Sequence, residues 1–387
     1  MRIAYVSADP GVPVFGRKGC SVHVQEVLRA LARRGAQIEL FATSCAGPPG
    51  AGLEDVRLHC LAPPPKGDLA CRERGCLATN QALGAALAAQ APFGLVYERY
   101  SLWSFAAMEY ARAVSTPALL EVNAPLIEEQ AEHRGLVDRA GAQRVAERVF
   151  GAATALLAVS EEVAAYLEGF APARGKVHVV PNGVSAERFP ADPKPSLPAA
   201  PGTFTVGFVG TMKPWHGLGD LLEAFALLHG RNPATRLLLV GDGAGREELA
   251  AKAAARGLGD AVRFTGAVPP DEVPGLVASM DVGVAPYPSS TNFYFSPLKV
   301  YEYMAAGLPI VASRVGQLEQ LLESEVTGLL VSPGDVSSLA ACLERVRQEP
   351  GLGLRLGKAA RAKALGDHTW DRTVERILSL AGSRSAS

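Results

Sequence analysis

The sequence predicts an α/β protein with two Rossmann-like domains that face a cleft. Its 387 residues exceed what one ordinary core holds and suit two domains of similar size. The order strand, loop, helix, strand occurs near the N-terminus and returns in the second half, and this order indicates parallel sheets. A proline-rich stretch separates the two halves.

The N-terminal half opens with an apolar strand at residues 3–7, followed by a loop at 9–19 that is rich in Pro and Gly. An amphipathic helix then begins near Ser21, because apolar residues recur at the spacing of one helical face. A second strand follows at 37–42. Together these segments form one βαβ unit.

The proline-rich stretch carries five prolines between residues 190 and 202, a composition typical of a linker. We therefore expect an N-terminal domain at 1–185, a linker at 186–202 and a C-terminal domain at 203–367. A helix at 219–228 follows the first strand of the second half. The strands expected there are 205–209, 237–240, 262–265, 282–285, 310–312 and 328–331.

Composition excludes several classes of partner. The net charge of −1 and the lack of Lys/Arg runs give no basis for binding nucleic acid. No apolar stretch approaches the ~20 residues that a membrane-spanning helix needs. The N-terminus begins directly on a strand with no signal-peptide pattern, so we expect a cytoplasmic protein.

Six cysteines are spread along the chain, and in a cytoplasmic protein we expect them to be reduced. His59, Cys60, Cys71 and Cys76 are spaced only loosely like zinc ligands. We expect plain thiols and no metal site.

The most informative segment is 294–313, YFSPLKVYEYMAAGLPIVAS. Ser296 fits the N-cap of a helix, Pro297 its first position and Gly307 the residue after its end. Lys299 then falls in the first turn, where the helix dipole disfavours a cation by ~0.3–1 kcal/mol. A bound anion reverses that penalty, so the pattern favours a phosphate site.

Glu302 lies one turn beyond Lys299 on the same side of this helix. Its carboxylate is suited to accept hydrogen bonds from the hydroxyls of a ribose. The alternative is a local ion pair between Lys299 and Glu302, worth ~0.2–0.5 kcal/mol.

A second candidate is the loop between Gly210 and Gly217, which contains Lys213, Trp215 and His216. A loop of this kind after a strand brings backbone N–H groups and a cation to a phosphate, although such glycines often mark only a tight turn. The Gly-Lys-Ser/Thr ending of the P-loop is missing, which disfavours ATP hydrolysis.

The first loop supplies a third candidate in Gly16, Arg17, Lys18 and Gly19, which are suited to approach a phosphate from the other domain. The G-x-G-x-x-G fingerprint of dinucleotide-binding proteins is absent. We expect His23, in the helix that follows, to pack in the core rather than to act as a base.

Polar residues near two further strand ends form a fourth candidate. Residues 97–100 follow the strand-like pair Leu95-Val96, and another strand ends in Glu121 and Asn123. Carboxyl ends of parallel strands face the ligand in this architecture. The alternative is that Glu121 is simply buried against Arg99.

These segments together resemble the retaining glycosyltransferases of family 4 over nearly the whole chain. The most specific part is SPLKVYEYMAAGLPIVAS at 296–313, supported by Asn182-Gly183-Val184, Gly241-Asp242-Gly243 and Phe264-Thr265-Gly266. The resemblance implies a GT-B fold, no required metal, and a nucleotide-diphosphate sugar donor held mainly by the C-terminal domain. It also implies that a last helix at about 368–381 packs back onto the N-terminal domain.

In this family a glutamate at the place of Glu302 holds the ribose, the helix N-terminus faces the diphosphate and the base meets backbone near Val268. We expect a UDP-sugar in preference to a GDP- or ADP-sugar. The donor-binding residues expected are Gly16, Arg17, Lys18, Gly19, Gly210, Thr211, Lys213, His216, Gly217, Gly241, Val268, Tyr294, Ser296, Pro297, Leu298, Lys299 and Glu302.

The sequence departs from the family at three places. The first glutamate of the paired-glutamate motif falls on Tyr294, the usual Arg and Lys fall on Thr211 and His216, and a histidine near the acceptor falls on Asn123. The chain thus resembles a divergent branch. We expect Lys213, Lys299 and Asn123 to act in catalysis, and Arg99, Glu121 and Asn123 to line the acceptor side.

The resemblance implies transfer of a sugar to an acceptor hydroxyl with retention of anomeric configuration. A nucleotide-sugar epimerase of similar fold and a non-catalytic nucleotide-sugar binding protein are the alternatives. The acceptor stays open among glycans, lipid-linked sugars and small metabolites, as does the oligomeric state. Leu102, Trp103 and Phe105 suit either buried packing, which we favour, or contact with the inner face of the membrane.

Overall fold

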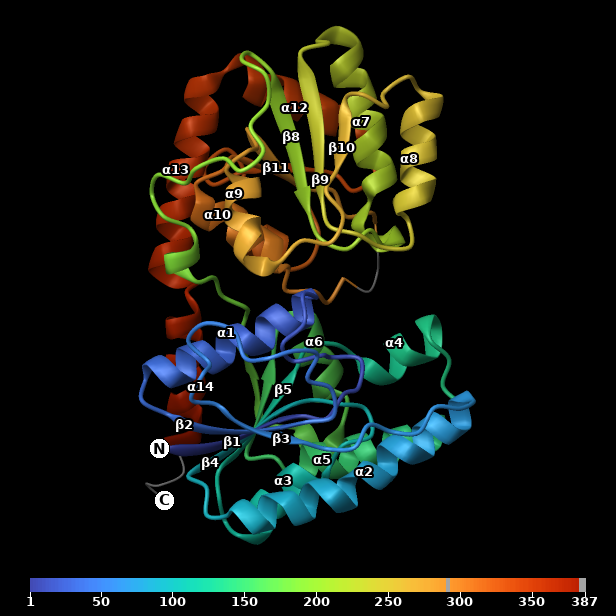
Figure 1. The fold of residues 1–387 in the computed structure, drawn as a ribbon, viewed down its shortest axis with the longest axis vertical. Helices are drawn as coiled ribbons and strands as arrows, with labels where there is room; N and C mark the ends of the chain where they lie inside the picture. The colour runs from blue at the N-terminus through green and yellow to red at the C-terminus, as the bar shows by residue number, and fades with distance from the viewer. Residues whose placement is uncertain (290–292, 383–387) are drawn as a thin grey trace. The chain divides into compact units, whose positions relative to one another are not determined.

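The computed structural model describes residues 1–289 and 293–382, and the chain divides into two compact units (Figure 1). Unit 1 comprises Met1–Asn182, Tyr294–Ser296 and Trp370–Ser387, and unit 2 comprises Gly183–Phe293 and Pro297–Thr369. Residues 186–202, expected as a linker, are thus part of unit 2. Each unit is built on one parallel sheet.

Unit 1 contains a seven-stranded sheet in the order β3-β2-β1-β4-β5-β6-β7. Every neighbouring pair is parallel, and β1 runs beside β2 from Arg2 opposite Gln37 to Ser7 opposite Ala42. The strands are β1 (Arg2–Ser7), β2 (Gln37–Ala42), β3 (Arg57–Cys60), β4 (Leu95–Arg99), β5 (Ala118–Val122), β6 (Ala155–Ala158) and β7 (Val177–Val179).

Helices cover both faces of this sheet, which is why its central strands are apolar along their whole length. On one face α1 packs against β2 and against α14, while on the other face α2, α3 and α5 enclose the main core (Figure 1). The helices are α1 (Gly19–Arg33), α2 (Leu69–Gln90), α3 (Ala106–Ala113), α4 (Leu126–His133), α5 (Arg139–Ala152), α6 (Glu161–Glu168) and α14 (Trp370–Gly382).

Unit 2 contains a six-stranded parallel sheet in the order β10-β9-β8-β11-β12-β13. Its strands are β8 (Phe204–Val209), β9 (Thr235–Val240), β10 (Val262–Phe264), β11 (Val282–Ala285), β12 (Ile310–Ser313) and β13 (Leu329–Val331).

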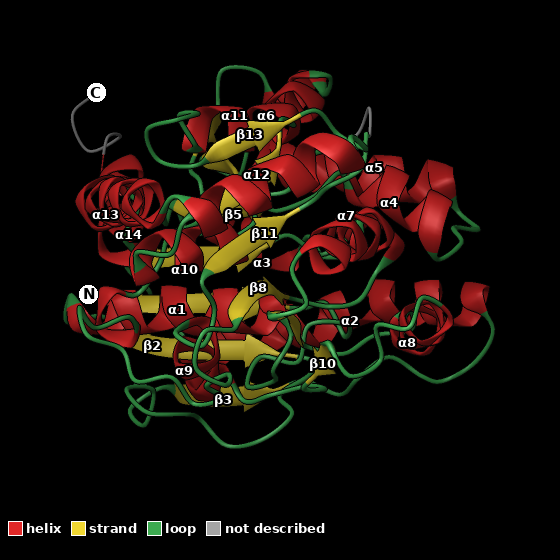
Figure 2. Cartoon of the chain, turned by 90° about the horizontal axis from the view of Figure 1, so that it is seen from above, coloured by secondary structure: helices red, strands yellow, loops and turns green. Residues whose placement is uncertain are grey.

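The helices of unit 2 again alternate with strands along the chain, and helices flank its strands in Figure 2. One face is covered by α7, α8 and α12, whose apolar side chains pack on Phe208 and Leu239, and α9, α10 and α13 lie on the other. The helices are α7 (Leu218–Arg231), α8 (Arg246–Ala255), α9 (Val273–Val277), α10 (Leu298–Ala306), α11 (Leu318–Leu321), α12 (Val336–Gln348) and α13 (Pro350–Asp367).

The strands expected from the sequence are confirmed with end shifts of no more than two residues, apart from the strand at Leu95-Val96. The helix expected to begin near Ser21 is also confirmed, and it begins at Gly19. Strand β4 continues to Arg99, so residues 97–99 lie inside the strand instead of following it. Leu102 and Trp103 are buried in the core of unit 1, in agreement with the favoured expectation of packing. Within the described ranges, no helix is long and apolar enough to cross a membrane.

Helix α13 touches α10 without intervening side chains. A Cβ atom on Gly357 of α13 would lie 1.9 Å from the carbonyl oxygen of Gly307. Gly307 ends α10 in the left-handed conformation (φ +72°), which glycine adopts without strain. The backbones of the two helices therefore meet at this point, and α13 fixes the end of α10.

We predict that Gly357→Ala destabilises unit 2, because the added methyl group forces the two backbones apart. Gly366→Ala in the same helix is the matched control, since nothing lies within 4 Å of its Cβ position. That control should be neutral or stabilising by up to ~1 kcal/mol, through helix propensity. Thermal unfolding of both variants measures the difference, and equal midpoints would contradict the packing argument.

Candidate functional site

The strand order of each unit reverses at one point. In unit 2 it reverses between β8 and β11, and in unit 1 between β1 and β4. In open α/β sheets, ligands bind outside the carboxyl ends of the strands at such a switch point. In unit 2 this place lies between the loop after Val209 and the segment after Ala285.

The loop after β8 packs tightly on the segment after β11. Gly217 has φ +64°, and a Cβ atom at this position would lie 1.6 Å from the carbonyl oxygen of Pro286. No other residue fits there without moving the backbone. The loop, which contains the short 3-10 helix Pro214–His216, is thus held at the switch point.

The loops after β8, β9 and β10 are hydrogen-bonded to one another. The Met212 N–H donates to the Asp242 carbonyl at 2.9 Å, and the Gly245 N–H donates to the Met212 carbonyl at 3.1 Å. The Gly241 N–H donates to Thr265 Oγ1 at 3.3 Å. Val268, half-buried, follows in the segment after β10. These glycine-containing loops form a fixed edge of the sheet.

Helix α10 begins one residue later than expected. Its N-cap is Pro297, which provides no side-chain hydrogen bond, so the assignment of Ser296 as N-cap is wrong. Ser296 instead accepts a hydrogen bond at Oγ from the Asn182 N–H (3.1 Å) and at its carbonyl from Asn182 Nδ2 (2.7 Å), within unit 1. Pro297 itself has ψ 103°, outside the helical region, so the helix begins at Leu298. Lys299 becomes the second helical residue.

The side chain of Lys299 is buried, with 7% exposure, and no described residue forms a hydrogen bond with its ammonium group. Nζ lies 3.9 Å from the ring centre of Phe208 and 5.3 Å from that of Tyr287. A Cβ atom on Gly210 would lie 3.0 Å from Nζ, so the amine is directed at the loop after β8. Burial lowers the pKa of Lys299 to about 7, against a smaller opposing effect of Glu302.

An amine without a partner at this depth destabilises the fold, because a buried donor normally finds an acceptor. Contacts with the two aromatic faces offset only part of the lost hydration. Lys299 and the N–H groups at the start of α10 therefore offer hydrogen-bond donors on the side of α10 that faces the loop after β8, as an anion site requires.

Glu302, one turn along α10, pairs with Arg188 rather than locally with Lys299. Arg188 Nη1 lies 3.2 Å from Glu302 Oε1, and Arg188 Nη2 donates to the Pro270 carbonyl at 2.8 Å. The local ion pair considered from the sequence is therefore not formed, since the nitrogen of Lys299 has no hydrogen-bond partner in the described structure. Arg188 fixes the carboxylate at the side of the helix.

His216, the position at which the family resemblance implies a cation, is neutral. Its Nδ1 donates to the Thr211 carbonyl, and its ring lies 5.8 Å from those of Phe208 and Tyr287. Burial and the nearby Lys299 lower the pKa of His216 to about 3. At neutral pH the ring offers Nε2 as a hydrogen-bond acceptor and no positive charge.

Lys213 and Thr211 are exposed on the same loop, and Lys213 Nζ lies 5.4 Å from the ring centre of Trp215. Gly210, Lys213, His216, Gly217 and Lys299 are thus brought together by the structure.

Tyr294 makes its contacts in unit 1. Its phenol donates to Glu129 Oε2 at 2.8 Å, and its carbonyl accepts from Ser160 Oγ at 3.0 Å. Ser160 also caps α6 through the Val163 N–H. Tyr294 therefore anchors the short segment Tyr294–Ser296 to α4 and α6.

A buried carboxylate organises the candidate acceptor side of unit 1. Glu121 accepts hydrogen bonds from the Tyr97 hydroxyl, from Asn123 Nδ2 and from Arg99 Nη1 at 3.1 Å. His23 Nε2 lies 2.8 Å from the same carboxylate. Burial alone would raise the pKa of Glu121, but His23, Arg99 and Tyr97 outweigh it and hold the pKa well below its usual range.

His23 is 4% exposed and meets the ring of Trp370 edge-on, with 5.0 Å between ring centres. The expectation that it packs in the core is confirmed. The alternative considered for Glu121, burial against Arg99, describes its surroundings correctly. Asn123 borders this network at the carboxyl end of β5.

The first loop leads directly into α1. Lys18 is the N-cap of this helix and Gly19 its first residue, and Arg17 and Lys18 are exposed. Gln25 Nε2 donates to the carbonyls of Val14 and Gly16 at 2.9 and 3.0 Å and so holds the loop against the helix.

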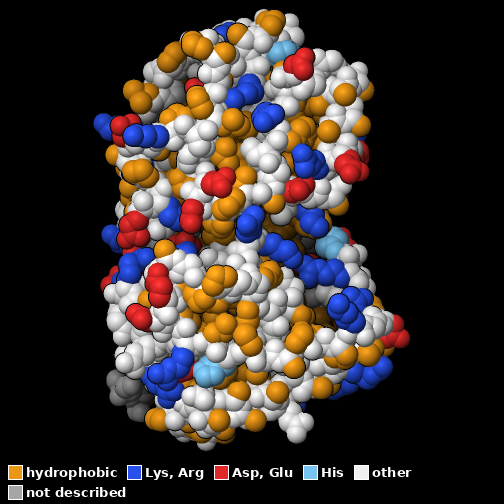
Figure 3. Space-filling model, in the orientation of Figure 1, with side chains coloured by type: hydrophobic (Ala, Val, Ile, Leu, Met, Phe, Trp, Pro, Cys, Tyr) orange, Lys and Arg blue, Asp and Glu red, His pale blue; other side chains and the backbone are white. Residues whose placement is uncertain are grey.

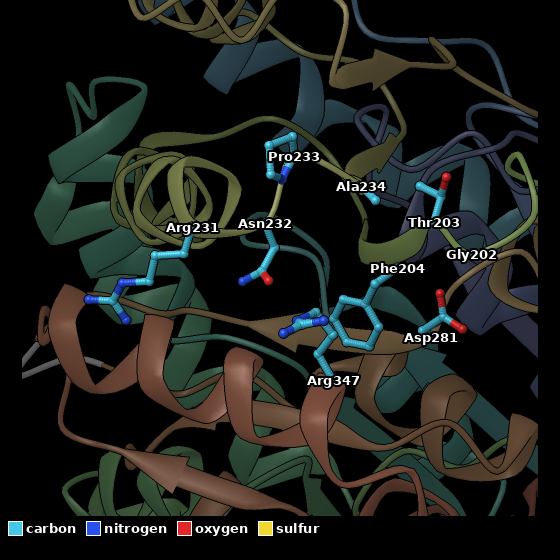
Figure 4. A pocket seen from close by; sticks show the side chains of 9 residues that line it. All are labelled: Gly202, Thr203, Phe204, Arg231, Asn232, Pro233, Ala234, Asp281 and Arg347. Carbon is cyan, nitrogen blue, oxygen red and sulfur yellow. The ribbon is translucent and has the colours of Figure 1, made fainter.

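Two further features lie apart from the switch point. A hollow of about 440 Å³ opens beside Arg231, Asp281 and Arg347 (Figure 4), at the amino ends of β8, β9 and β11, the opposite edge of the sheet. Across residues 1–289 and 293–382, no group of three His, Cys, Asp or Glu side chains is arranged to hold a metal ion.

Three residues of the site were missed by sequence reasoning: Arg188, Phe208 and Tyr287. In the sequence Phe208 and Tyr287 look like ordinary strand and loop residues. They lie beside Lys299 because of the order of the strands in the sheet. Arg188 lies four residues after the Asn182-Gly183-Val184 motif. Its place close to a family motif is the signal by which the sequence could have identified it.

Two family models match the chain in succession. Residues 18–183 match "Glycosyl transferase 4-like domain" and residues 203–349 match "Glycosyl transferases group 1". The D-inositol 3-phosphate glycosyltransferase of Actinosynnema mirum is 32% identical, across 97% of this chain and 94% of its own. The chain belongs to the group 1 glycosyltransferases, family 4. It is a retaining glycosyltransferase that uses a nucleotide-sugar donor.

Solved structures show the same fold. Sucrose-phosphate synthase from Thermosynechococcus elongatus superposes with a TM-score of 0.78 at 23% identity, covering 100% of this chain and 99% of its own. HepE of Anabaena, solved in complex with UDP-glucose, superposes with a TM-score of 0.71 at 20% identity, covering 99% and 100%. The fold is GT-B, as expected from the sequence.

We predict that Lys299→Met raises thermal stability, because it removes a buried charge without a partner. The folded pKa near 7 lies below the ~10.4 of an unfolded lysine, so the unfolded chain binds more protons between these values. The wild type therefore gains stability as pH rises through this window. The advantage of Lys299→Met should be greatest below about pH 7 and should shrink towards about pH 9.

Melting curves of both proteins at several pH values measure this difference. Lys252→Met on α8 is the control, since Lys252 is half exposed and pairs with Glu248 on the surface. A Lys299→Met protein that melts below the wild type at acidic pH would contradict the prediction.

Proposed function

We propose that unit 2 binds the diphosphate of the donor between the N-terminus of α10 and the loop 210–217, with Lys299 as its main buried cation. The observation that supports this most directly is the ammonium of Lys299, directed at Gly210 with no hydrogen-bond partner in the described structure. Phosphate oxygens accept hydrogen bonds from such an amine and from the N–H groups of Leu298 and Lys299 in the first turn of α10.

We further propose that Glu302 accepts hydrogen bonds from the ribose hydroxyls, held in place by Arg188. The guanidinium bridges Glu302 and the Pro270 carbonyl, which limits the rotation of the carboxylate. The base lies against the backbone of the loops at Gly241 and Val268 in this proposal. These two loops follow β9 and β10, the strands that continue the sheet from β8 away from the switch point.

In this proposal Lys213 and Lys299 take the place of the two cations that the family resemblance implies at Thr211 and His216. His216 does not take this role, because its low pKa leaves it neutral. It is suited instead to accept a hydrogen bond at Nε2 from a donor hydroxyl. With Tyr294 in place of the first glutamate, the chain represents a divergent branch in this proposal, and the hydroxyl of Tyr294 is engaged by Glu129.

In the proposed reaction, the bond between the anomeric carbon and the diphosphate oxygen breaks, and the acceptor hydroxyl oxygen forms a new bond on the same face. The proton of that hydroxyl passes to the departing phosphate. Lys299, Lys213 and the amides of α10 stabilise the charge that develops there. Preorganised groups of this kind lower a barrier by several kcal/mol, on the order of 3 kcal/mol for one donor.

The acceptor is proposed to bind near Arg99, Glu121 and Asn123 at the carboxyl edge of the unit 1 sheet. The relative from Actinosynnema mirum is named for an inositol phosphate, and HepE was solved with UDP-glucose. We propose a UDP-sugar donor and a hydroxyl-rich sugar or cyclitol acceptor in the cytoplasm.

On the face shown in Figure 3, charged side chains of both signs lie among hydrophobic ones.

Donor turnover tests the proposal directly. The protein is incubated with UDP-, GDP- and ADP-sugars and a panel of glycan, inositol phosphate and lipid-linked acceptors, and the released nucleoside diphosphate is measured. Release that depends on an acceptor is the expected result with at least one UDP-sugar. Tight nucleotide binding with no release from any donor and acceptor would favour the binding-protein alternative.

We predict that Lys299→Met weakens donor binding about 30- to 150-fold, because a charge-assisted contact in a buried site contributes ~2–3 kcal/mol. Calorimetric titration with UDP-glucose measures the dissociation constant. Lys252→Met, on the surface of α8, should bind as the wild type does. Unchanged affinity of Lys299→Met would exclude Lys299 from the diphosphate site.

Donor affinity should also depend on pH. Since the pKa of Lys299 is about 7 and diphosphate binding requires the ammonium form, the affinity is steady at acidic pH. It then falls as pH rises above about 7, with a limiting slope of about tenfold per pH unit. The same titrations from about pH 6 to about pH 9 check this, and a flat profile would contradict it. Lys299→Arg, which stays charged, should remove the dependence.

A further inference from the structure

Two cysteines of unit 1 lie in direct contact, outside the sites described above. Cys45 Sγ and Cys60 Sγ are 2.9 Å apart. Cys60 is the last residue of β3 and is exposed, and Cys45 follows β2 and is half-buried. Both thiols are free.

The backbone fixes this pair from both sides. Strands β2 and β3 are parallel, with Ala42 opposite Cys60. After Cys45 the chain turns sharply, because Ala46 adopts a left-handed conformation with φ +52°. The turn keeps Cys45 beside the end of β3.

Cys45 is also hydrogen-bonded to the first loop. The Phe15 N–H donates to the Cys45 carbonyl at 2.8 Å, and the Val14 N–H donates to the Ser44 carbonyl at 2.9 Å. Gly16 follows immediately and is held by Gln25 from the other side. A constraint on Cys45 is thus transmitted through two backbone hydrogen bonds to the loop that carries Arg17 and Lys18.

We propose that Cys45 and Cys60 form a reversible disulfide under peroxide and that this bond stiffens the first loop. Thiols in a reducing compartment stay reduced until an oxidant reaches them. The disulfides that form in such a compartment are usually transient and serve in catalysis or redox sensing. The pair is thereby a modification site of the chain.

The exposed Cys60 reacts first. Its thiolate attacks a peroxide oxygen, the O–O bond breaks, and a sulfenic acid and hydroxide result. Cys45 then attacks the sulfur of Cys60, the S–O bond breaks, and the thiol proton of Cys45 passes to the leaving hydroxide. In sum two thiols and one hydrogen peroxide give one disulfide and two waters. A dithiol reductant reverses the step by thiol–disulfide exchange.

This order follows from the surroundings of the two sulfurs. Burial and the adjacent Cys60 raise the pKa of Cys45 to about 12, so Cys45 is a poor first nucleophile. Its position against Cys60 makes it the resolving thiol.

The full-length protein provides the test. After reduction and removal of the reductant, wild type, Cys45→Ser, Cys60→Ser and the control Cys342→Ser are treated with hydrogen peroxide and alkylated, and the peptides are mapped by mass spectrometry. A peptide pair joined through Cys45 and Cys60 is expected in wild type and Cys342→Ser alone. Separate sulfinic acids at both positions, or a link from Cys45 to another cysteine, would overturn the disulfide.

Hydrogen exchange at the Phe15 amide tests the effect on the loop. Exchange should slow about tenfold in the oxidised wild type and recover with dithiothreitol, since stiffening suppresses local opening. Peroxide should leave this amide unchanged in Cys60→Ser. A disulfide that forms without altering Phe15 exchange would overturn the link to the loop. Neither readout uses donor turnover, so both stand independently of the proposed transferase site.

Discussion

The central constraint of unit 2 is an ammonium group that has no hydrogen-bond partner in the described structure. Lys299 is held between two aromatic rings at the point where the strand order reverses, and its pKa falls to about 7 as a result of burial. Such a group weakens the fold, and the proposed binding of the donor diphosphate accounts for its presence. The surrounding loops are arranged around that one position.

The glycines of the loops set the packing around Lys299, where we propose that the donor binds. Gly217 allows the loop after β8 to touch the carbonyl of Pro286, and Gly210 leaves open the space into which the amine is directed. Gly357 allows α13 to lie directly on the end of α10. The same helix presents both Lys299 and Glu302, so its placement sets the spacing between a diphosphate and a ribose in the proposed site.

Much of this arrangement could be predicted from the sequence, because it depends on local patterns. Apolar periodicity located the strands, and the cation in the first turn of a helix indicated an anion site at Lys299. The N-cap was misplaced because Ser296 has the right chemistry, while its actual partner, Asn182, is more than a hundred residues away in the chain. The aromatic contacts of Lys299, the neutral state of His216 and the Arg188–Glu302 pair are likewise non-local.

Unit 1 is discontinuous in sequence, because helix α14 near the end of the chain belongs to it. Trp370 packs edge-on against His23, Arg33 lies 2.9 Å from Asp371, and the Thr373 hydroxyl reaches the Pro181 carbonyl. Residues separated by almost the whole chain thus share one core. A protein truncated near residue 185 would lose this helix and expose the apolar side of α1 to water. During synthesis on the ribosome, unit 1 therefore acquires its last helix only after unit 2 has been translated.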